Sequence, residues 1–419
     1  MSPAERLSPA DLLSQPRAAL SIPPSRHGRR DIRRWVRCTA AAASLALAGC
    51  ASMAPKYERP AAPVESSFPD TAGVPGGASV GDISWHTFFA NPNLKQLIGI
   101  ALENNRDLRA TGLAIEQARA QYQIRRADVL PTVNAGVSGQ RQPSQTGTGQ
   151  SSIYQAGLSI TAFEFDFFGR IRSLSNAALA QYLATEEAQR AAQISLIGAV
   201  ANTYLNVLAD EELLEVTRQA LRTREESLKL TKLKFDNGAA SELDFRQAES
   251  LIESARVTLA QVSRQRALDR NALVLLLGQP LPANLSASKL VKGQDMLPEL
   301  PIGLPSEVLT RRPDILQAEQ QLIAANADIG AARANFYPRI TLTGSAGVAS
   351  RHLSDLFNNG VFAWTMAPQL LVPIFDRGRN RANLRATEAA RDIAVAQYEQ
   401  SIQNAFREVA DALAGRATL

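Results

Sequence analysis

The hydrophobic positions along the chain divide it into long helical stretches and short alternating ones. Residues 93–127 carry apolar side chains at three- and four-residue spacing, which predicts a helix that Pro131 closes. A second helical pattern runs from about 171 to 235 without proline, and a third runs from 241 to 277. A helix over the second stretch would be about 100 Å long, far longer than a globular domain is wide. We therefore expect these two stretches to form a coiled-coil hairpin.

Between the helical stretches the period changes from 3.6 to 2, which predicts β-strands. Apolar residues alternate with small or polar ones in Tyr154–Ala162, Ile340–Val348 and Phe362–Leu370, and more weakly from Val133 onward. Stretches of this length with one apolar face are typical of transmembrane barrel strands, which need about 9 to 11 residues. A soluble sandwich is the alternative, but it would not explain such long helices attached to so few strands.

Four strands cannot close a barrel, and lipid does not tolerate open sheet edges. We therefore expect several copies of the chain to assemble. Two copies would close eight strands around their own side chains, whereas three would close twelve strands around a lumen.

The segment FDNGAASELD joins the two helices of the predicted hairpin. Gly238 can adopt the positive φ that a tight turn needs, and Ser241 with Asp244 is typical of a helix cap with an acid in the first turn. These residues fit a plain loop between two core helices equally well. A function for this tip has to rest on other observations.

The chain contains an internal repeat. RADVLPTV at 126–133 returns as RANFYPRI at 333–340, a spacing of 207 residues, and FDFFGRIR at 165–172 returns as FDRGRNR at 375–381. Each unit is predicted to be a helix, a strand pair and a long helix. Pro131 and Pro338 mark the point in each unit where a helix gives way to a membrane strand.

Asp166 and Asp376 occupy matching positions in the two units, where a strand changes to a helix. A carboxylate there accepts hydrogen bonds from free amide groups, so we interpret both as helix caps rather than transport residues. The second unit ends at Leu419, before a counterpart of the hairpin tip and returning helix. We expect this unit to be C-terminally incomplete, with a naturally shorter C-terminus as the alternative.

Charge is concentrated at the N-terminus. Residues 1–49 hold eight Arg and three acids, a net charge of +5 that equals the net charge of the whole chain. The remainder is neutral by count, which argues against nucleic-acid binding. The segment ends in a basic run, a short apolar run and the residues LAGC, which is typical of a lipoprotein signal peptide. Cys50 is then the predicted lipidated first residue of the mature chain, and Cys38 is lost with the signal.

These patterns predict an order of segments along the chain. A Pro- and Gly-rich tether without a core of its own should follow the signal peptide. The predicted segments are a signal peptide at 1–49, the tether and start of an equatorial region at 50–92, a first repeat at 93–278, a Pro-rich linker at 279–305 and a second repeat at 306–419.

Sequence features of an enzyme are absent. The three histidines are His27, His86 and His352, and there is no nucleophile motif, phosphate-binding loop or pair of metal ligands. We expect no cofactor and no metal site. A lipoprotein scaffold with a coiled-coil hairpin is the stronger alternative to a channel, although it would not need two amphipathic strand pairs.

An ordered series of segments resembles the outer membrane factor lipoproteins of the NodT type, which have a TolC-like fold. The segments are ISWHTFFANPNLKQLIGIALENNRDL, ARAQYQIRRADVLPTV, FEFDFFGR, ALVLLLGQPLP, LTRRPDILQAE and IGAARANFYPRITLTGSAG. The resemblance implies an α+β membrane protein, mostly α, that forms a homotrimer with a twelve-stranded barrel, a periplasmic helical barrel and a mixed equatorial belt.

The same resemblance implies a passive outer membrane conduit for drugs, dyes, metals or other small compounds. It would work with a periplasmic adaptor protein and an inner-membrane pump of the RND type. Carried over by position, Cys50 is the lipid anchor and FDNGAASELD is one periplasmic tip, where Asp236, Gly238, Ser241 and Asp244 are candidates for contact with the adaptor. A truncated, non-functional channel is the alternative that the short second unit leaves open.

Overall fold

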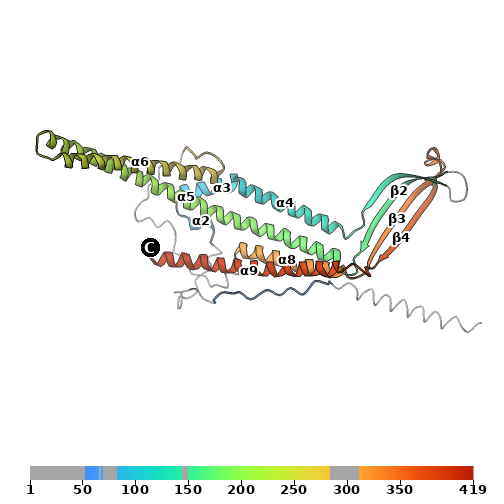
Figure 1. Ribbon diagram of the computed structural model, residues 1–419. Coiled ribbons are helices and arrows are strands. Elements are labelled where there is room, and N and C mark those ends of the chain that lie inside the picture. Colours follow the sequence, from blue (N-terminus) through green and yellow to red (C-terminus); the bar gives the residue numbers. More distant parts are fainter. Residues whose placement is uncertain (1–51, 66–67, 69–82, 144–149, 284–310, 419) are drawn as a thin grey trace, which may run out of the picture. The chain divides into compact units, whose positions relative to one another are not determined.

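The computed structural model describes residues 52–65, 68, 83–143, 150–283 and 311–418 (Figure 1). The predicted signal peptide, Cys50 and most of the predicted linker lie outside these residues. The elements, in chain order, are α2 (Trp85–Phe88), α3 (Pro92–Asn104), α4 (Arg106–Ala127), β1 (Val133–Pro143), β2 (Gln150–Phe165), α5 (Arg170–Asp236), α6 (Glu242–Leu277), α8 (Pro313–Ala334), β3 (Arg339–Ser350), the short 3₁₀ helix η2 (Leu353–Asp355), β4 (Val361–Leu371) and α9 (Arg379–Thr418). The fold is mostly helical with one small antiparallel sheet, as predicted.

The helix predicted over residues 93–127 is interrupted at Asn105. This residue has extended backbone angles, and its side-chain oxygen accepts from the Leu108 amide at 2.9 Å, so it caps α4 as a new helix. Its side-chain nitrogen donates to the carbonyl of Leu276 at 2.9 Å. The prediction of a single helix was wrong because Asn105 ends α3 and caps α4. The same side chain connects this break to the end of α6.

Helices α5 and α6 form the predicted hairpin. Helix α5 has 67 residues and α6 has 36, which is about 100 Å and about 54 Å at the α-helical rise. Among the described residues, α5 alone is long and apolar enough by composition to pass as a membrane-spanning helix, but it packs along α4, α6 and α8. A core of buried side chains from α3, α5 and α6 includes Leu97, Ile98, Tyr204, Leu273 and Leu277. This core fixes the base of the hairpin.

Helix α8 packs closely against α5 through small side chains. Ala177 and Ala180 of α5 meet Ala324 and Ala327 of α8 in a buried cluster. Small residues let the two backbones approach each other closely. Helix α9 lies against α8, and α4 lies against α5.

The four strands form one antiparallel sheet in the order β1-β2-β3-β4. Val133 pairs with Ile160 in the first hairpin, and Ile340 pairs with Leu370 in the second. The register between β2 and β3 shifts between Ile160 and Phe163, where Ala162 has a φ of 50°. Such a bulge increases the local bend of a strand. Strands β1 and β4 are the two edges of the sheet.

The described part of the predicted tether is packed against the helices. Tyr57, Ala62 and Val64 cover a cluster of buried residues from α8 and α9 that includes Ile315 and Ile402. The Glu319 carboxylate accepts from Tyr57 Oη at 3.0 Å and from Arg59 Nε and Nη2 at 2.7 Å each. Residues 52–65 therefore have no helix or strand, and the core that they contact is that of α8 and α9.

Candidate functional site

The sheet has one apolar and one polar face. Registered rows place Ala135, Leu158, Ala346 and Trp364 side by side across the four strands, and the next row on the same face ends in Phe362. Leu158 and Trp364 are 56% and 67% exposed, although both are apolar. Such a face, two strands or more wide, is typical of a sheet that contacts lipid.

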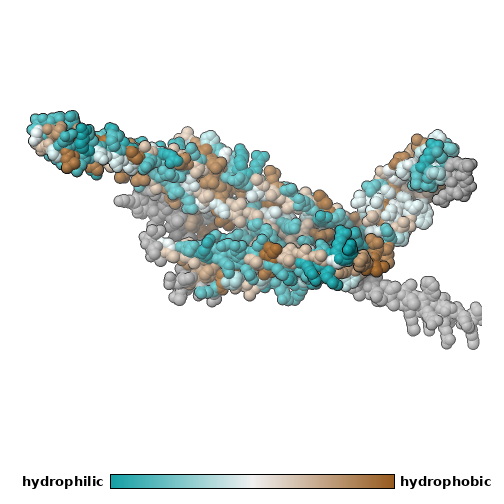
Figure 2. All heavy atoms as spheres, viewed as in Figure 1, coloured by the Kyte–Doolittle hydropathy of each residue, from teal (hydrophilic) through white to brown (hydrophobic). Residues whose placement is uncertain are grey.

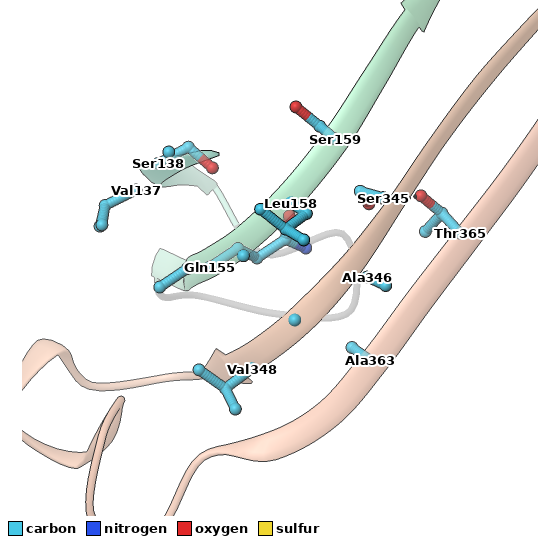
Figure 3. A pocket seen from close by; sticks show the side chains of 14 residues that line it. Val137, Ser138, Gln155, Leu158, Ser159, Ser345, Ala346, Val348, Ala363 and Thr365 are labelled. Atoms are coloured by element: carbon cyan, nitrogen blue, oxygen red, sulfur yellow. Dashed lines mark hydrogen bonds between the residues drawn. The ribbon is translucent and has the colours of Figure 1, made fainter. Parts of the chain in front are cut away.

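The opposite face carries small polar side chains. Asn134, Ser159, Ser345 and Thr365 form one row across the sheet. Figure 3 shows the last three on neighbouring strands, and the hydroxyls of Ser345 and Thr365 are 2.7 Å apart, within hydrogen-bond distance. Water can solvate this face, whereas exposing the apolar face to water costs free energy.

The next row on the polar face has almost no side chains. It is formed by Gly136, Gly157, Gly347 and Ala363. A hollow of about 190 Å³ lies against it (Figure 3). A Cβ on Gly157 would lie 2.3 Å from the carbonyl oxygen of Ala346, and one on Gly347 would lie 2.1 Å from that of Ala156. The two central strands therefore approach each other at a point that admits only glycine.

Replacing Gly157 or Gly347 with alanine is expected to destabilise the sheet by about 1–3 kcal/mol, because the backbones of β2 and β3 must move apart. The measurement is the thermal unfolding temperature of detergent-solubilised protein. Gly136→Ala in the same row is the matched control, because a Cβ there meets nothing within 4 Å. Equal shifts for all three variants would contradict the close approach as the cause.

An ionic junction joins the sheet to the helices. Glu164, near the end of β2, accepts from Arg170 Nε at 2.7 Å and from Arg170 Nη2 at 2.8 Å. It also accepts from Arg339 Nη2 at 2.5 Å. Arg170 begins α5 and Arg339 begins β3, so one carboxylate, whose side chain is 10% exposed, connects both repeats at the sheet boundary.

The junction also gathers exposed hydrophobic side chains. Figure 2 shows a hydrophobic patch where the helices end next to the sheet, and large apolar side chains exposed in this region include Phe336, Tyr337, Val372, Ile374 and Phe375. Ile374 is 95% exposed and Phe375 is 84% exposed. Side chains of this kind in a single chain are expected to be covered by lipid or by another protein surface.

The predicted caps and prolines lie at the ends of the strands. The Asp166 carboxylate accepts from the amides of Ile171 and Arg172 at 3.1 and 2.9 Å. Asp376 accepts from the amides of Asn380 and Gly378 at 2.8 and 2.9 Å, and these amides lower its pKa. Pro131 lies two residues before β1 and Pro338 lies immediately before β3.

The hairpin tip contains the four residues predicted there. Asp236 is the last residue of α5 and lies 3.4 Å from Lys232 Nζ, and Gly238 has a φ of 73°. Ser241 Oγ accepts from the Asp244 amide at 3.1 Å, while the Asp244 carboxylate accepts from the Ser241 amide at 3.1 Å. The Ser241 hydroxyl also donates to the Asp244 carboxylate at 2.7 Å. This hydrogen bond first, and the one from the Ser241 amide second, lower the pKa of Asp244. The two bonds to backbone amides form a capping box. Ser241 is thus hydrogen-bonded to Asp244, whereas the Asp236 carboxylate contacts Lys232.

An aromatic stack below the turn was not predicted. The rings of Phe235 and Phe245 are 5.5 Å apart and nearly parallel, and Lys232 and Arg246 lie over Phe245 at 5.5 and 5.6 Å. These contacts hold the two helix ends together. The two phenylalanines flank the Asn237-Gly238 turn in the sequence, two residues before it and seven residues after it, and this was the available signal.

Metal ligands do not converge in the described part of the chain. Within it, no group of three or more His, Cys, Asp or Glu side chains is placed to hold a metal ion. Cys50, the predicted lipidation site, lies outside the described residues.

An amphipathic sheet with two free edges, continuous with long helices of which α5 is about 100 Å long, defines a class of protein: subunits of outer membrane channels. A family profile described as outer membrane efflux protein matches residues 97–279 and 304–419. The chain belongs to this family. The resemblance stated from the sequence is thereby confirmed, together with the fold class and the outer membrane efflux role.

Curated relatives and solved structures of similar proteins agree with this family assignment. The chain is 49% identical over 377 residues to outer membrane protein OprJ of Pseudomonas aeruginosa, covering 88% of this chain and 79% of OprJ. It is 48% identical over 387 residues to the solvent efflux pump outer membrane protein SrpC of Pseudomonas putida, covering 90% and 82%. The open state of the MtrE outer membrane channel of Neisseria gonorrhoeae is similar with a TM-score of 0.78 at 42% identity, covering 88% of this chain and 82% of MtrE.

Proposed function

We propose that three copies of this chain close a twelve-stranded barrel in the outer membrane and form the exit channel of a tripartite efflux pump. The observation that carries this proposal is the four-stranded sheet with one apolar face, one polar face and two unpaired edges. An edge exposed to lipid leaves backbone groups without hydrogen bonds, so the sheet must be continued by other copies. Twelve strands leave a lumen lined by the polar face.

The channel is a passive conduit. A periplasmic adaptor protein and an inner-membrane pump supply the substrate and the energy, and the channel itself catalyses no reaction. The relatives SrpC and TtgI are named for solvent and toluene efflux, which supports small organic compounds as the class of cargo. A lumen lined by serine and threonine side chains and by glycine residues would bind such compounds weakly, as a conduit requires.

Two further sites belong to this proposal. Cys50 carries the lipid that anchors the chain in the outer membrane. The tip residues Asp236, Gly238, Ser241 and Asp244 contact the adaptor. All four lie at the end of the α5/α6 hairpin, and the exposed side chains of Leu230 and Leu233 beside them are available to a partner.

The experiment that tests the barrel places a charge on each face of the sheet. Trp364→Lys is expected to reduce the amount of assembled protein in the outer membrane sharply, because a lysine facing lipid costs about 2–4 kcal/mol near the membrane centre. Thr365→Lys on the polar face is the matched control and is expected to assemble. The measurement is the yield of protein in purified outer membranes.

A scaffold lipoprotein predicts a different result. If the strands did not face lipid, Trp364→Lys and Thr365→Lys would give the same yield as the unchanged protein. That outcome would contradict the proposed channel.

A further inference from the structure

The two hairpins of the sheet have the same register, which the internal repeat did not by itself require. Adding 207 to a residue number in β1 and 210 to one in β2 converts the pair Val133 and Ile160 into the pair Ile340 and Leu370. The pair Ala135 and Leu158 converts in the same way into Leu342 and Pro368. The hairpins are therefore structural copies, residue by residue.

The seam between the hairpins lies within the chain, where β2 pairs with β3. Before the bulge, Ile160 pairs with Gly344, Ser159 with Ser345 and Leu158 with Ala346. A closed barrel needs a consistent stagger and tilt from strand to strand. If three copies close a barrel, the seam between copies should therefore repeat the displacement of the seam within one copy.

We propose that β4 of one copy pairs antiparallel with β1 of a second copy, with Leu370 opposite Val137 and Gln369 opposite Ser138. This register follows from the seam within the chain by the same offsets, since β2 corresponds to β4 and β3 corresponds to β1. The inference rests on the proposed trimer and adds which residues of the two edges meet. It spans the edges from Trp364 opposite Pro143 to Leu370 opposite Val137, the counterparts of the pairs from Tyr154 with Ser350 to Ile160 with Gly344.

The faces of the two edges support this register. Val137 lies in the same cross-strand row as Phe362, and Leu370 lies on the same face as Phe362 because their spacing along β4 is even. The proposed register therefore opposes Leu370 and Val137, which are 62% and 65% exposed in the single chain, on one continuous apolar face. A slip of one residue would place apolar side chains opposite polar ones across the whole seam. Slips of two residues keep the faces and are the competing registers.

Cysteine cross-linking distinguishes these registers. In the full chain assembled in outer membranes, the double variant Gln369→Cys with Ser138→Cys is oxidised with copper phenanthroline and run on a non-reducing gel. Gln369→Cys combined with Gly136→Cys or with Gln140→Cys represents the two slips. Directly opposite positions have Cβ atoms about 4.5–5.5 Å apart and diagonal ones about 7–8 Å, so the first variant should give about tenfold more cross-linked oligomer.

Any disulfide formed between these positions joins two copies. Edge strands β1 and β4 are separated by β2 and β3, which places them about 14 Å apart in one chain, too far for a disulfide. Single-cysteine variants control for cross-links through the natural cysteines. The pair Leu370→Cys with Val137→Cys repeats the test on the apolar face if the first pair fails to assemble.

The outcomes separate this inference from the proposed function. Stronger cross-linking of Gln369 with Gly136 or Gln140 than with Ser138, in protein that still has the mass of a trimer, would overturn the register but keep the channel. Protein that is monomeric by mass and forms no cross-link in any variant would overturn both. Preferential cross-linking of Gln369 with Ser138, and of Leu370 with Val137, is the expected result.

Discussion

Gly278→Ala is expected to lower the free energy of unfolding by about 3 kcal/mol. The positive φ contributes roughly 1–2 kcal/mol of this loss. The steric contact of the added Cβ contributes roughly 1–3 kcal/mol. Gly278 ends α6 with a φ of 67°, a conformation that costs energy for residues with a side chain. An added Cβ would also lie 2.3 Å from the carbonyl oxygen of Asn104. The two penalties act on the same residue at the base of the hairpin.

The position of Gly278 makes the consequence larger than local strain. The preceding Leu277 is fully buried in the core of α3, α5 and α6, and the carbonyl of Leu276 accepts from the Asn105 side chain. Moving the backbone at Gly278 disturbs both the cap of α4 and this core. Urea unfolding of detergent-solubilised protein, followed by far-ultraviolet circular dichroism, measures the loss.

Gly238→Ala is the matched control for this variant. Gly238 has a φ of 73° at the hairpin tip, and a Cβ there meets nothing within 4 Å. Its expected cost is therefore the backbone cost alone, about 1–2 kcal/mol. Equal losses for Gly238→Ala and Gly278→Ala would contradict the role of the Asn104 contact.

Glu164→Gln is expected to lower the free energy of unfolding by about 2–3 kcal/mol. The substitution leaves the guanidinium groups of Arg170 and Arg339 close together without the carboxylate that both contact. Breaking a fully buried ion pair costs about 3–5 kcal/mol, and the smaller figure here allows for an Arg339 side chain that is 48% exposed. The same unfolding measurement applies, and the sheet is expected to detach from the helices earlier than the hairpin core unfolds.

Glu253→Gln is the control for the loss of one ion pair. Glu253 lies 2.7 Å from Arg256 on the surface of α6, and the two side chains are 68% and 56% exposed. An exposed pair on a helix contributes about 0.5 kcal/mol or less. A loss for Glu164→Gln as small as that for Glu253→Gln would contradict the ionic junction as a structural connection between the repeats.

The periodic parts of the fold could be predicted from the sequence. The change of period at Tyr154 and Ile340 located β2 and β3, and the unbroken helical pattern over 171–235 predicted α5. Periodicity reports which face of an element is apolar, and these elements are long enough for the pattern to be read. Their duplication was visible at the same residues.

Contacts between distant segments could not be predicted in this way. Glu164 and Arg339 are 175 residues apart, and Arg59 and Glu319 are 260 residues apart. The composition of residues 50–92 favoured a tether because proline and glycine oppose regular structure, yet a segment without helix or strand can still pack against a core. The break at Asn105 had a local signal, since an asparagine followed by Asp107 is typical of a helix start.

The most direct test of the channel is the mass and conductance of the protein purified from outer membranes. Multi-angle light scattering gives the number of chains in the detergent-solubilised particle, and planar bilayer recording of the same fraction measures ion flow. We predict three chains per particle and stepwise, ion-conducting insertions. Monomeric particles that conduct no ions, from correctly lipidated protein, would contradict the account.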